Sequence, residues 1–321
     1  SFDYGTYTFI ADYLPYVSGD GMEHRNSTIL ASTQSLLDND FGQKGTLSHE
    51  FIHAWNVERI RPASLEPFDF ERANMSANLW FAEGFTSYYG SLAIRRAGES
   101  SVADYTGALA NSINTVTHSP GRTFASAPGM SMQAPFVDAA SAIDPTNFAN
   151  TYISYYTYGA ALGLALDLTL RERFDDITLD SLMRHIWQIH GKTELPYTNF
   201  DLRDRLAEVT GSERFAAEFF DKFIFGQDLP DYRSLLANAG VVVRQRKSSG
   251  AYAGPVSLEF EGNDAIISDN TIIGSPLYEA GLDRGDTVVA IDRLKIRSQA
   301  RWDNALRRYS PGDTATISYI Q

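Results

Sequence analysis

Two histidines four positions apart, His49 and His53, place the tightest constraint on how this chain can fold. On an α-helix, residues i and i+4 lie one above the other, so both imidazoles would face the same side. Glu50 stands between them, and the pattern His-Glu-x-x-His is typical of a zinc site in which the glutamate acts as a general base. The segment around them therefore has to be helical, and the fold has to bring a further ligand to the same side of that helix.

The third ligand has to come from Asp, Glu or His, because the chain has no cysteine. A catalytic zinc ion takes three protein ligands and keeps one position open. Glu58 lies on the same helix and cannot reach over the ion. Glu83 instead stands in the apolar segment LWFAEGF, where a carboxylate is unfavourable unless it is paired or binds a metal. We therefore predict that His49, His53 and Glu83 bind one Zn²⁺ ion.

Other interpretations of these residues stay open. Two histidines on an amphipathic helix can simply be hydrogen-bonded near a core, and Glu83 can be a solvated residue on an exposed strip. Zinc is favoured because two imidazoles and a carboxylate suit it, but cobalt or manganese accept the same ligands.

Composition excludes several classes of function. The chain has 321 residues with a net charge of −13, whereas nucleic acids and anionic membranes require a basic face. No run reaches the ~18 apolar residues of a membrane-spanning helix, and the first residues do not have the layout of a signal peptide. We expect a soluble protein of a bacterial cytoplasm or periplasm. The sequence starts without Met, so we also expect it to be a piece of a longer precursor.

Periodicity predicts an α+β protein with two domains, residues 1–240 and 241–321. Residues 18–28 are rich in turn-forming residues, and residues 118–136 are expected to be irregular. Strands are predicted over 4–12 and 28–32, and helices over 46–59, 78–96, 101–116, 155–174, 179–190, 200–209 and 212–225.

Two segments together carry a family resemblance. HEFIHAWNVERIRP followed by LWFAEGFTSYYG resembles the glycyl aminopeptidase family, gluzincin metallopeptidases that carry a PDZ domain. The 29 residues between His53 and Glu83 also fit that family. The resemblance implies a thermolysin-like, mainly helical catalytic domain over residues 1–240 and a preference for Gly or Ala as the first residue of the substrate. It also implies a β-rich N-terminal domain, which we do not expect within these 321 residues.

A second resemblance concerns substrate binding. The segment GDGMEHRNS is similar to the Gly-x-Met-Glu-Asn segment of the alanyl aminopeptidases, although His24 replaces the Asn. It implies that Gly21 and Met22 lie along the substrate cleft and that Glu23 binds the substrate's free amino group. A carboxylate at a fixed distance from the metal would then allow only the first peptide bond of the substrate to reach the metal. The alternative is that Glu23 is a solvated residue in a turn.

The same relatives imply a tyrosine that stabilises the oxyanion. In those enzymes it stands three residues before a helical glycine, and the segment YTYG puts Tyr156 at that place. Tyr155 and Tyr158 remain alternatives, as does a purely structural tyrosine.

The C-terminal part resembles a PDZ domain. The segment GSPLYEAGLDRGDTVVAIDRLKI, residues 274–296, is similar to the PDZ segment in which a Ser-Pro turn leads into a short helix, a Gly-Asp pair and a strand. Gly281 and Gly285 suit positions with positive φ. We expect the domain to be truncated before its last strand. A PDZ domain would bind an extended peptide by strand addition.

Together these features predict a zinc aminopeptidase that removes small N-terminal residues from peptides. A zinc endopeptidase would share the metal chemistry and ignore the substrate's amino group. A third candidate is a PDZ-based peptide-binding or chaperone-like protein with an idle metal site. The expected partners are a peptide with a free N-terminus and a peptide ligand of the PDZ-like domain, with no nucleic acid.

Overall fold

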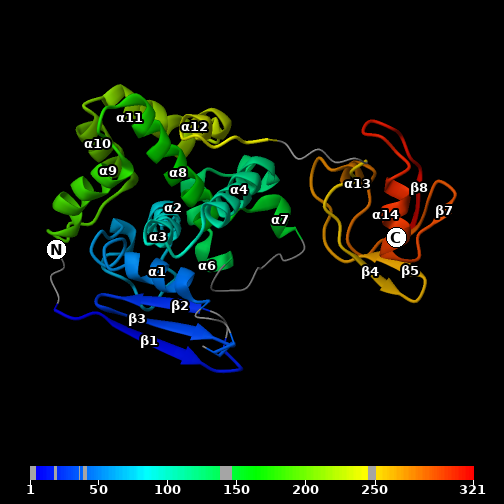
Figure 1. Ribbon diagram of the computed structural model, residues 1–321, viewed down its shortest axis with the longest axis horizontal. Coiled ribbons are helices and arrows are strands. Elements are labelled where there is room, and N and C mark those ends of the chain that lie inside the picture. The colour runs from blue at the N-terminus through cyan, green and yellow to red at the C-terminus, as the bar shows by residue number, and fades with distance from the viewer. Residues whose placement is uncertain (1–4, 18–19, 36, 39–41, 138–146, 245–250) are drawn as a thin grey trace. The chain divides into compact units, whose positions relative to one another are not determined.

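The computed structural model describes residues 5–17, 20–35, 37–38, 42–137, 147–244 and 251–321. The chain forms two compact units, and each contains helices and a β-sheet, so the protein has an α+β fold (Figure 1). The first unit comprises residues 1–118, 125–140 and 153–242, and the second comprises 119–124, 141–152 and 243–321. Two segments from the middle of the chain therefore belong to the second unit, although the predicted boundary near 240 assigns them to the first domain.

A small sheet lies on one side of the first unit. In the described part of this unit it has the order β1 (Thr8–Tyr13), β3 (Ser27–Ser32), β2 (Asp20–His24). β3 runs parallel to β1 and antiparallel to β2. Alternate residues of β3, among them Thr28 and Leu30, are buried, as expected for a sheet with one face toward a core.

The strand β2 corrects the sequence-based prediction, which assigned residues 18–28 to a turn-rich segment. Gly21 pairs with Leu30 and Glu23 with Thr28 in the ladder to β3. Backbone pairing with an adjacent strand here outweighs the turn preference of Gly, Asp and Asn, because strand propensity depends strongly on tertiary context.

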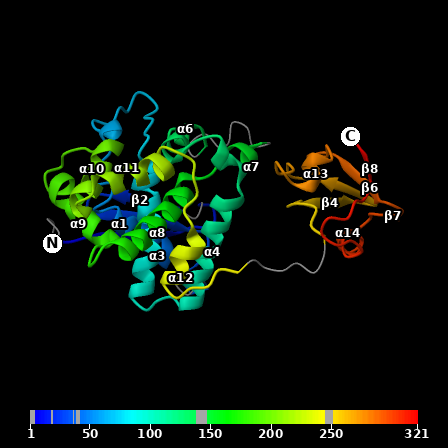
Figure 2. The same cartoon turned by 90° about the horizontal axis from the view of Figure 1, so that it is seen from above.

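Helices make up the rest of the first unit. They are α1 (Lys44–Ile52), α2 (Leu79–Ala82), α3 (Gly84–Arg96), α4 (Val102–His118), α5 (Ala127–Ser131), α6 (Ala134–Val137), α8 (Tyr155–Arg173), α9 (Leu179–Ile186), α10 (Asn199–Thr210), α11 (Glu213–Phe219) and α12 (Tyr232–Asn238), with shorter turns η1 (Ala63–Leu65), η3 (Trp187–Gly191) and η4 (Phe220–Ile224). Figure 1 shows α1 between the sheet and the pair α2 and α3, and α8 packs against α3. Figure 2 shows α9, α10 and α11 together on one side of the unit.

The core of the first unit forms where α8 crosses α2 and α3. Trp80, Phe81 and Phe85 are almost fully buried there, and α8 buries apolar residues along most of its length. Burial of each such side chain stabilises the fold by about 1.5–3 kcal/mol. Glycines permit the close approach: a Cβ on Gly84 would stand 2.3 Å from the Cα of Gly159.

Three predicted segments differ from the structure in their bounds. The helix predicted over 46–59 ends earlier, because α1 stops at Ile52 and the chain continues in turns. The helix predicted over 78–96 is interrupted at Glu83, between α2 and α3. The segment 118–136, predicted to be irregular, contains short helical turns that bury Ala127 and Met130.

The second unit contains a sheet of five strands in the part of the chain that the structure describes. The strands are β4 (Leu258–Glu261), β5 (Asp264–Ile267), β6 (Thr287–Ile291), β7 (Leu294–Lys295) and β8 (Ile317–Ile320), and the helical segments are η2 (Pro120–Thr123), α7 (Phe148–Thr151), α13 (Pro276–Glu279) and α14 (Gln299–Leu306). All pairings are antiparallel, and β8 pairs with β6.

Helix α7 joins the second unit through one buried side chain. Asn150 donates to the carbonyl oxygen of Thr271 at 2.9 Å and accepts from the amide of Ile273 at 2.8 Å. Gly281 and Gly285 have φ of 80° and 95°, as the sequence predicts. Across both units, none of the described helices has the length and apolar character needed to span a membrane.

Candidate active site

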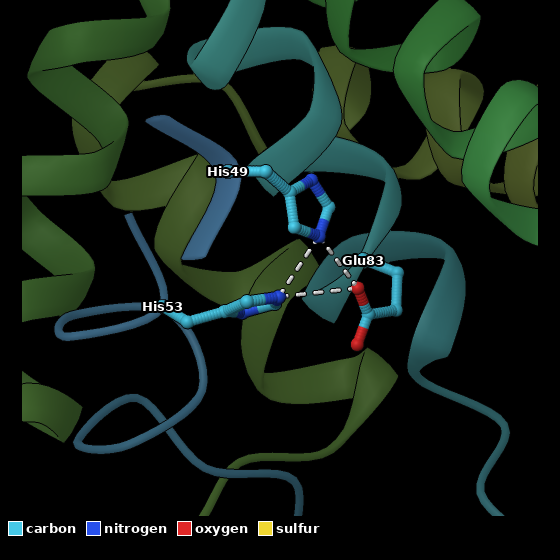
Figure 3. Close-up of side chains that lie close together, drawn as sticks. All are labelled: His49, His53 and Glu83. Atoms are coloured by element: carbon cyan, nitrogen blue, oxygen red, sulfur yellow. Dashed lines mark hydrogen bonds and ion pairs between the residues drawn. The ribbon is translucent and has the colours of Figure 1, made fainter. Parts of the chain in front are cut away.

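Three side chains converge between α1 and the start of α3 (Figure 3). The Nε2 atoms of His49 and His53 lie 3.0 Å apart. The Oε2 atom of Glu83 lies 3.2 Å from each of them. The residues predicted to bind a metal therefore meet at one point, although they come from segments about 30 residues apart.

These distances fit a single tetrahedral cation. Zinc binds nitrogen and oxygen at about 2.0–2.2 Å, so two ligands in a tetrahedral arrangement lie about 3.3 Å from one another. The observed separations between the ligand atoms, 3.0 and 3.2 Å, are close to this expected distance between two ligands. The donor set of two imidazoles and one carboxylate also suits zinc. The residues present therefore fit the metal that the sequence predicts.

The orientation of the His53 ring is set by a neighbouring carbonyl group. His53 caps the C-terminus of α1, and its Nδ1–H donates to the backbone oxygen of Asn56 at 2.6 Å. A proton on Nδ1 leaves the lone pair of Nε2 directed at the point where the three side chains meet. His49 has a weaker contact of 3.4 Å between Nδ1 and the hydroxyl of Ser87.

The three side chains are strongly coupled by charge. Burial lowers the pKa of His53, but Glu83 more than offsets this and raises it to about 9. Burial likewise raises the pKa of Glu83, but His53 and His49 outweigh burial and lower it to about 2. Glu83 therefore favours a positive charge at His53, and the same negative charge favours binding of a metal cation.

Glu50 lies beside this group on the next position of α1. It is 6% exposed, and burial raises its pKa to about 7, with Glu23 among the charges that add to the effect. Glu23 extends from β2 so that its carboxylate lies within 4.8 Å of ligand atoms of both Glu50 and His53. A Cβ on Gly21 would stand 2.5 Å from Oε1 of Glu50, so a side chain at this position would displace the carboxyl group of Glu50.

The site opens into a cavity of about 500 Å³. It is lined by Asp20, Gly21, Glu23, Gly45, Thr46, His49, Glu50, His53, Glu83, Ser87, Gly90, Ser91 and Tyr156. Four carboxylates face two imidazoles in this space, so the cavity favours cations, whether a metal ion or an ammonium group.

Some lining residues were not predicted from the sequence. Asp20 directly precedes Gly21 at the start of β2, and its position at the cavity could not be inferred without the strand. Ser87, Gly90 and Ser91 follow Glu83 at helical spacing, and this row of small residues on one face of α3 was the available signal.

The structure separates the three candidate tyrosines. Tyr156 lines the cavity, with its ring centroid 6.0 Å from that of His49, and it is 37% exposed. Tyr155 and Tyr158 are buried in the core instead, at 3% and 2% exposure. Tyr156 is therefore the tyrosine of this segment that is available to a ligand in the cavity.

Met22 lies away from the other predicted residues. It is 58% exposed and pairs with Ile29 across the sheet, whereas Gly21 and Glu23 on either side of it line the cavity. Side chains alternate along a strand, so residues adjacent in sequence face opposite sides of β2.

Comparison with known proteins agrees with this geometry. Residues 43–162 match the family model described as M61 glycyl aminopeptidase, and this segment includes the three converging side chains, Glu50 and Tyr156. Over this segment the chain is similar to the glycyl aminopeptidase family. The resemblance found in the sequence is thus confirmed.

A solved structure extends the similarity beyond the matched segment. The chain is similar to the crystal structure of an aminopeptidase N family protein from Idiomarina loihiensis, with a TM-score of 0.81 and 27% sequence identity. The match covers 98% of this chain and 56% of that chain, so the sequence spans little more than half of the relative's length. No curated protein matches the chain.

Proposed function

We propose that the protein is a zinc-dependent aminopeptidase that removes Gly or Ala from the N-terminus of peptides. The observation that carries this proposal is the meeting of His49, His53 and Glu83 at tetrahedral spacing, beside the buried carboxyl of Glu50. The preference for Gly and Ala rests on the family alone. We further propose that the first unit is a thermolysin-like catalytic domain and that the second is a PDZ-like domain.

Zinc held by His49, His53 and Glu83 would act as a Lewis acid and lower the pKa of water toward ~7. We assign the role of general base to Glu50. Its carboxyl faces the cavity beside His53, and its raised pKa of about 7 matches proton transfer near neutral pH. It would accept a proton from the attacking water and return it to the nitrogen of the leaving peptide.

Tyr156 and Glu23 act on two other parts of the substrate. The hydroxyl of Tyr156 would donate a hydrogen bond to the oxygen that becomes negative as the peptide carbonyl is attacked. Glu23 would accept hydrogen bonds from the substrate's ammonium group and fix its distance from the scissile bond. With Asp20 and Glu50 lining the same cavity, that end of the site is negatively charged and suits a free amine.

The experiment that tests the proposal compares an Ala- or Gly-initiated peptide with its N-acetylated counterpart. Both are incubated with zinc-loaded protein, with and without a chelator. We expect cleavage of the first bond of the free peptide only, and loss of that cleavage with chelator. Equal cleavage of both peptides would identify an endopeptidase instead, and no cleavage of either would contradict the proposed activity.

A single substitution separates amine recognition from the rest of the chemistry. Glu23→Gln removes the charge but keeps the size of the side chain. If Glu23 binds the ammonium group, the variant loses discrimination between the free and the acetylated peptide and keeps its zinc. Unchanged discrimination would assign amine recognition to another group, with Asp20 the next candidate because it lines the same cavity.

A further inference from the structure

One buried side chain links the two segments that carry the metal ligands. Asn56 follows α1 and is 1% exposed. Its amide Nδ2 donates toward the carbonyl oxygens of Phe81 and Ala82, at 3.1 and 3.2 Å. These are the last residues of α2, directly before Glu83. The carbonyl groups at the end of a helix need partners from outside that helix, and Asn56 supplies donors to two of them.

The backbone of the same residue holds His53. The carbonyl oxygen of Asn56 accepts the Nδ1–H of His53 at 2.6 Å, the contact that directs Nε2 of His53 toward the other ligands. One residue therefore contacts His53 through its main chain and the segment before Glu83 through its side chain. A shift of Asn56 would therefore change the distance and orientation of His53 relative to Glu83.

Thr86 completes the connection. Its hydroxyl lies 3.2 Å from Nδ2 of Asn56 and 2.6 Å from the carbonyl oxygen of Ala82. Nδ2 of Asn56 has three hydrogen-bond partners, and two of them are carbonyl oxygens that can only accept, so the amide nitrogen and not the amide oxygen has to face them. Oδ1 of Asn56 has no hydrogen-bond partner among the residues that the structure describes. The contribution of this side chain thus lies in its donors.

We propose that Asn56 is a positioning residue of the metal site, which fixes His53 relative to Glu83 before a metal ion binds. This inference rests on the proposed function, because it requires that the two residues bind zinc. Groups that orient metal ligands typically change metal affinity about 10–100-fold when they are removed. Asn56→Ala keeps the backbone carbonyl that accepts from His53 and removes the donors to the end of α2.

The test measures the zinc dissociation constant by competition with a chelator, together with the visible spectrum of the Co²⁺-loaded protein and the melting temperature of the metal-free protein. For Asn56→Ala we expect zinc binding to weaken about 10–100-fold and the Co²⁺ bands to change in position or intensity. Asn150→Ala is the matched control, because it removes an equally buried asparagine that donates to a backbone carbonyl in the second unit. It should lower the melting temperature without weakening zinc binding.

A second variant covers the case in which Asn56→Ala does not fold. Thr86→Val keeps the shape of the side chain and removes the hydroxyl between Asn56 and Ala82, so it should weaken zinc binding by a smaller factor. Wild-type zinc affinity and an unchanged Co²⁺ spectrum in the folded variants would overturn the inference and leave the proposed function intact. Failure of the wild-type protein to bind zinc would overturn both.

Discussion

Gly159 provides a sharp test of how the fold positions the site. It lies in α8, three residues after Tyr156, where that helix crosses α2. A Cβ at this position would stand 1.8 Å from the carbonyl oxygen of Trp80 and 2.8 Å from the Cα of Gly84. Both neighbours are backbone atoms, so a Gly159→Ala variant cannot relieve the overlap by rotating a side chain.

The magnitude follows from these distances. Ordinary van der Waals contact begins near 3.4 Å, so α8 would have to move from α2 by about 1.6 Å. Overpacking typically lowers the free energy of unfolding by about 1–3 kcal/mol. Each kcal/mol lowers the melting temperature by about 2–4 °C in a unit of this size, which gives a fall of about 2–12 °C. Misplacement of a catalytic group by about 1 Å can lower the rate about 100-fold, and we expect kcat to fall similarly through Tyr156.

The assay combines calorimetry of the metal-free protein with turnover of an Ala-initiated peptide. Gly107→Ala in α4 is the control, because no atom lies within 4 Å of the added Cβ, and it should stabilise the protein by up to about 1 kcal/mol. Gly163→Ala should be milder than Gly159→Ala, since its Cβ would meet a ring atom of Phe85 at 3.3 Å. A Gly159→Ala variant with wild-type stability and turnover would refute the close crossing of α8 over α2.

Three further predictions concern the site itself. Glu50→Gln should keep its zinc and lose about 10²–10⁴ in kcat, measured together with metal content; full activity would exclude Glu50 as the general base. Tyr156→Phe should lower kcat about 10²–10³-fold with unchanged zinc affinity, whereas Tyr155→Phe should change kcat less than tenfold; equal effects would contradict the assignment of Tyr156. Burial lowers the pKa of His53, but Glu83 outweighs burial and raises this pKa from 6.5 to about 9. The interaction of protonated His53 with Glu83 therefore stabilises the metal-free protein fully below pH 6.5, and this stabilisation is lost as the pH rises through 9. The melting temperature of the metal-free protein should therefore fall between pH 6.5 and 9, and a Glu83→Gln variant that falls equally would show that another group is responsible.

The convergence of His49, His53 and Glu83 could be predicted from the sequence, because each of these residues carries a local signal. Helical spacing places His49 and His53 on one face, and apolar neighbours single out Glu83 as a carboxylate that needs a partner. Long apolar or periodic segments also predicted the major helices, and the helix over 155–174 agrees with α8 (Tyr155–Arg173).

The features that sequence did not predict depend on contacts between distant segments. Strand β2 forms because β3 pairs with it, although its own residues favour turns. The break at Glu83 and the early end of α1 accompany hydrogen bonds from Asn56 and Thr86, residues with no motif of their own. Met22 shows the same limit, because its orientation follows from the strand alternation that the turn prediction omitted.

The division of the chain into two units also depends on long-range contacts. Asn150 lies in sequence just before α8, yet its hydrogen bonds join it to Thr271 and Ile273 of the second unit. A buried asparagine that satisfies the backbone of a distant loop has no sequence signature. The second compact unit therefore includes the segments 119–124 and 141–152, which lie before α8 in the sequence.

The measurement that tests the central claim most directly is anomalous diffraction at the zinc edge from crystals of the zinc-loaded protein. We predict one peak at bonding distance, about 2.0–2.2 Å, from Nε2 of His49, Nε2 of His53 and Oε2 of Glu83. Glu23, Glu50 and His53 form a second group whose ligand atoms also lie within 4.8 Å of one another. A peak at that second group, or no peak at either, would contradict the assignment of the catalytic metal site.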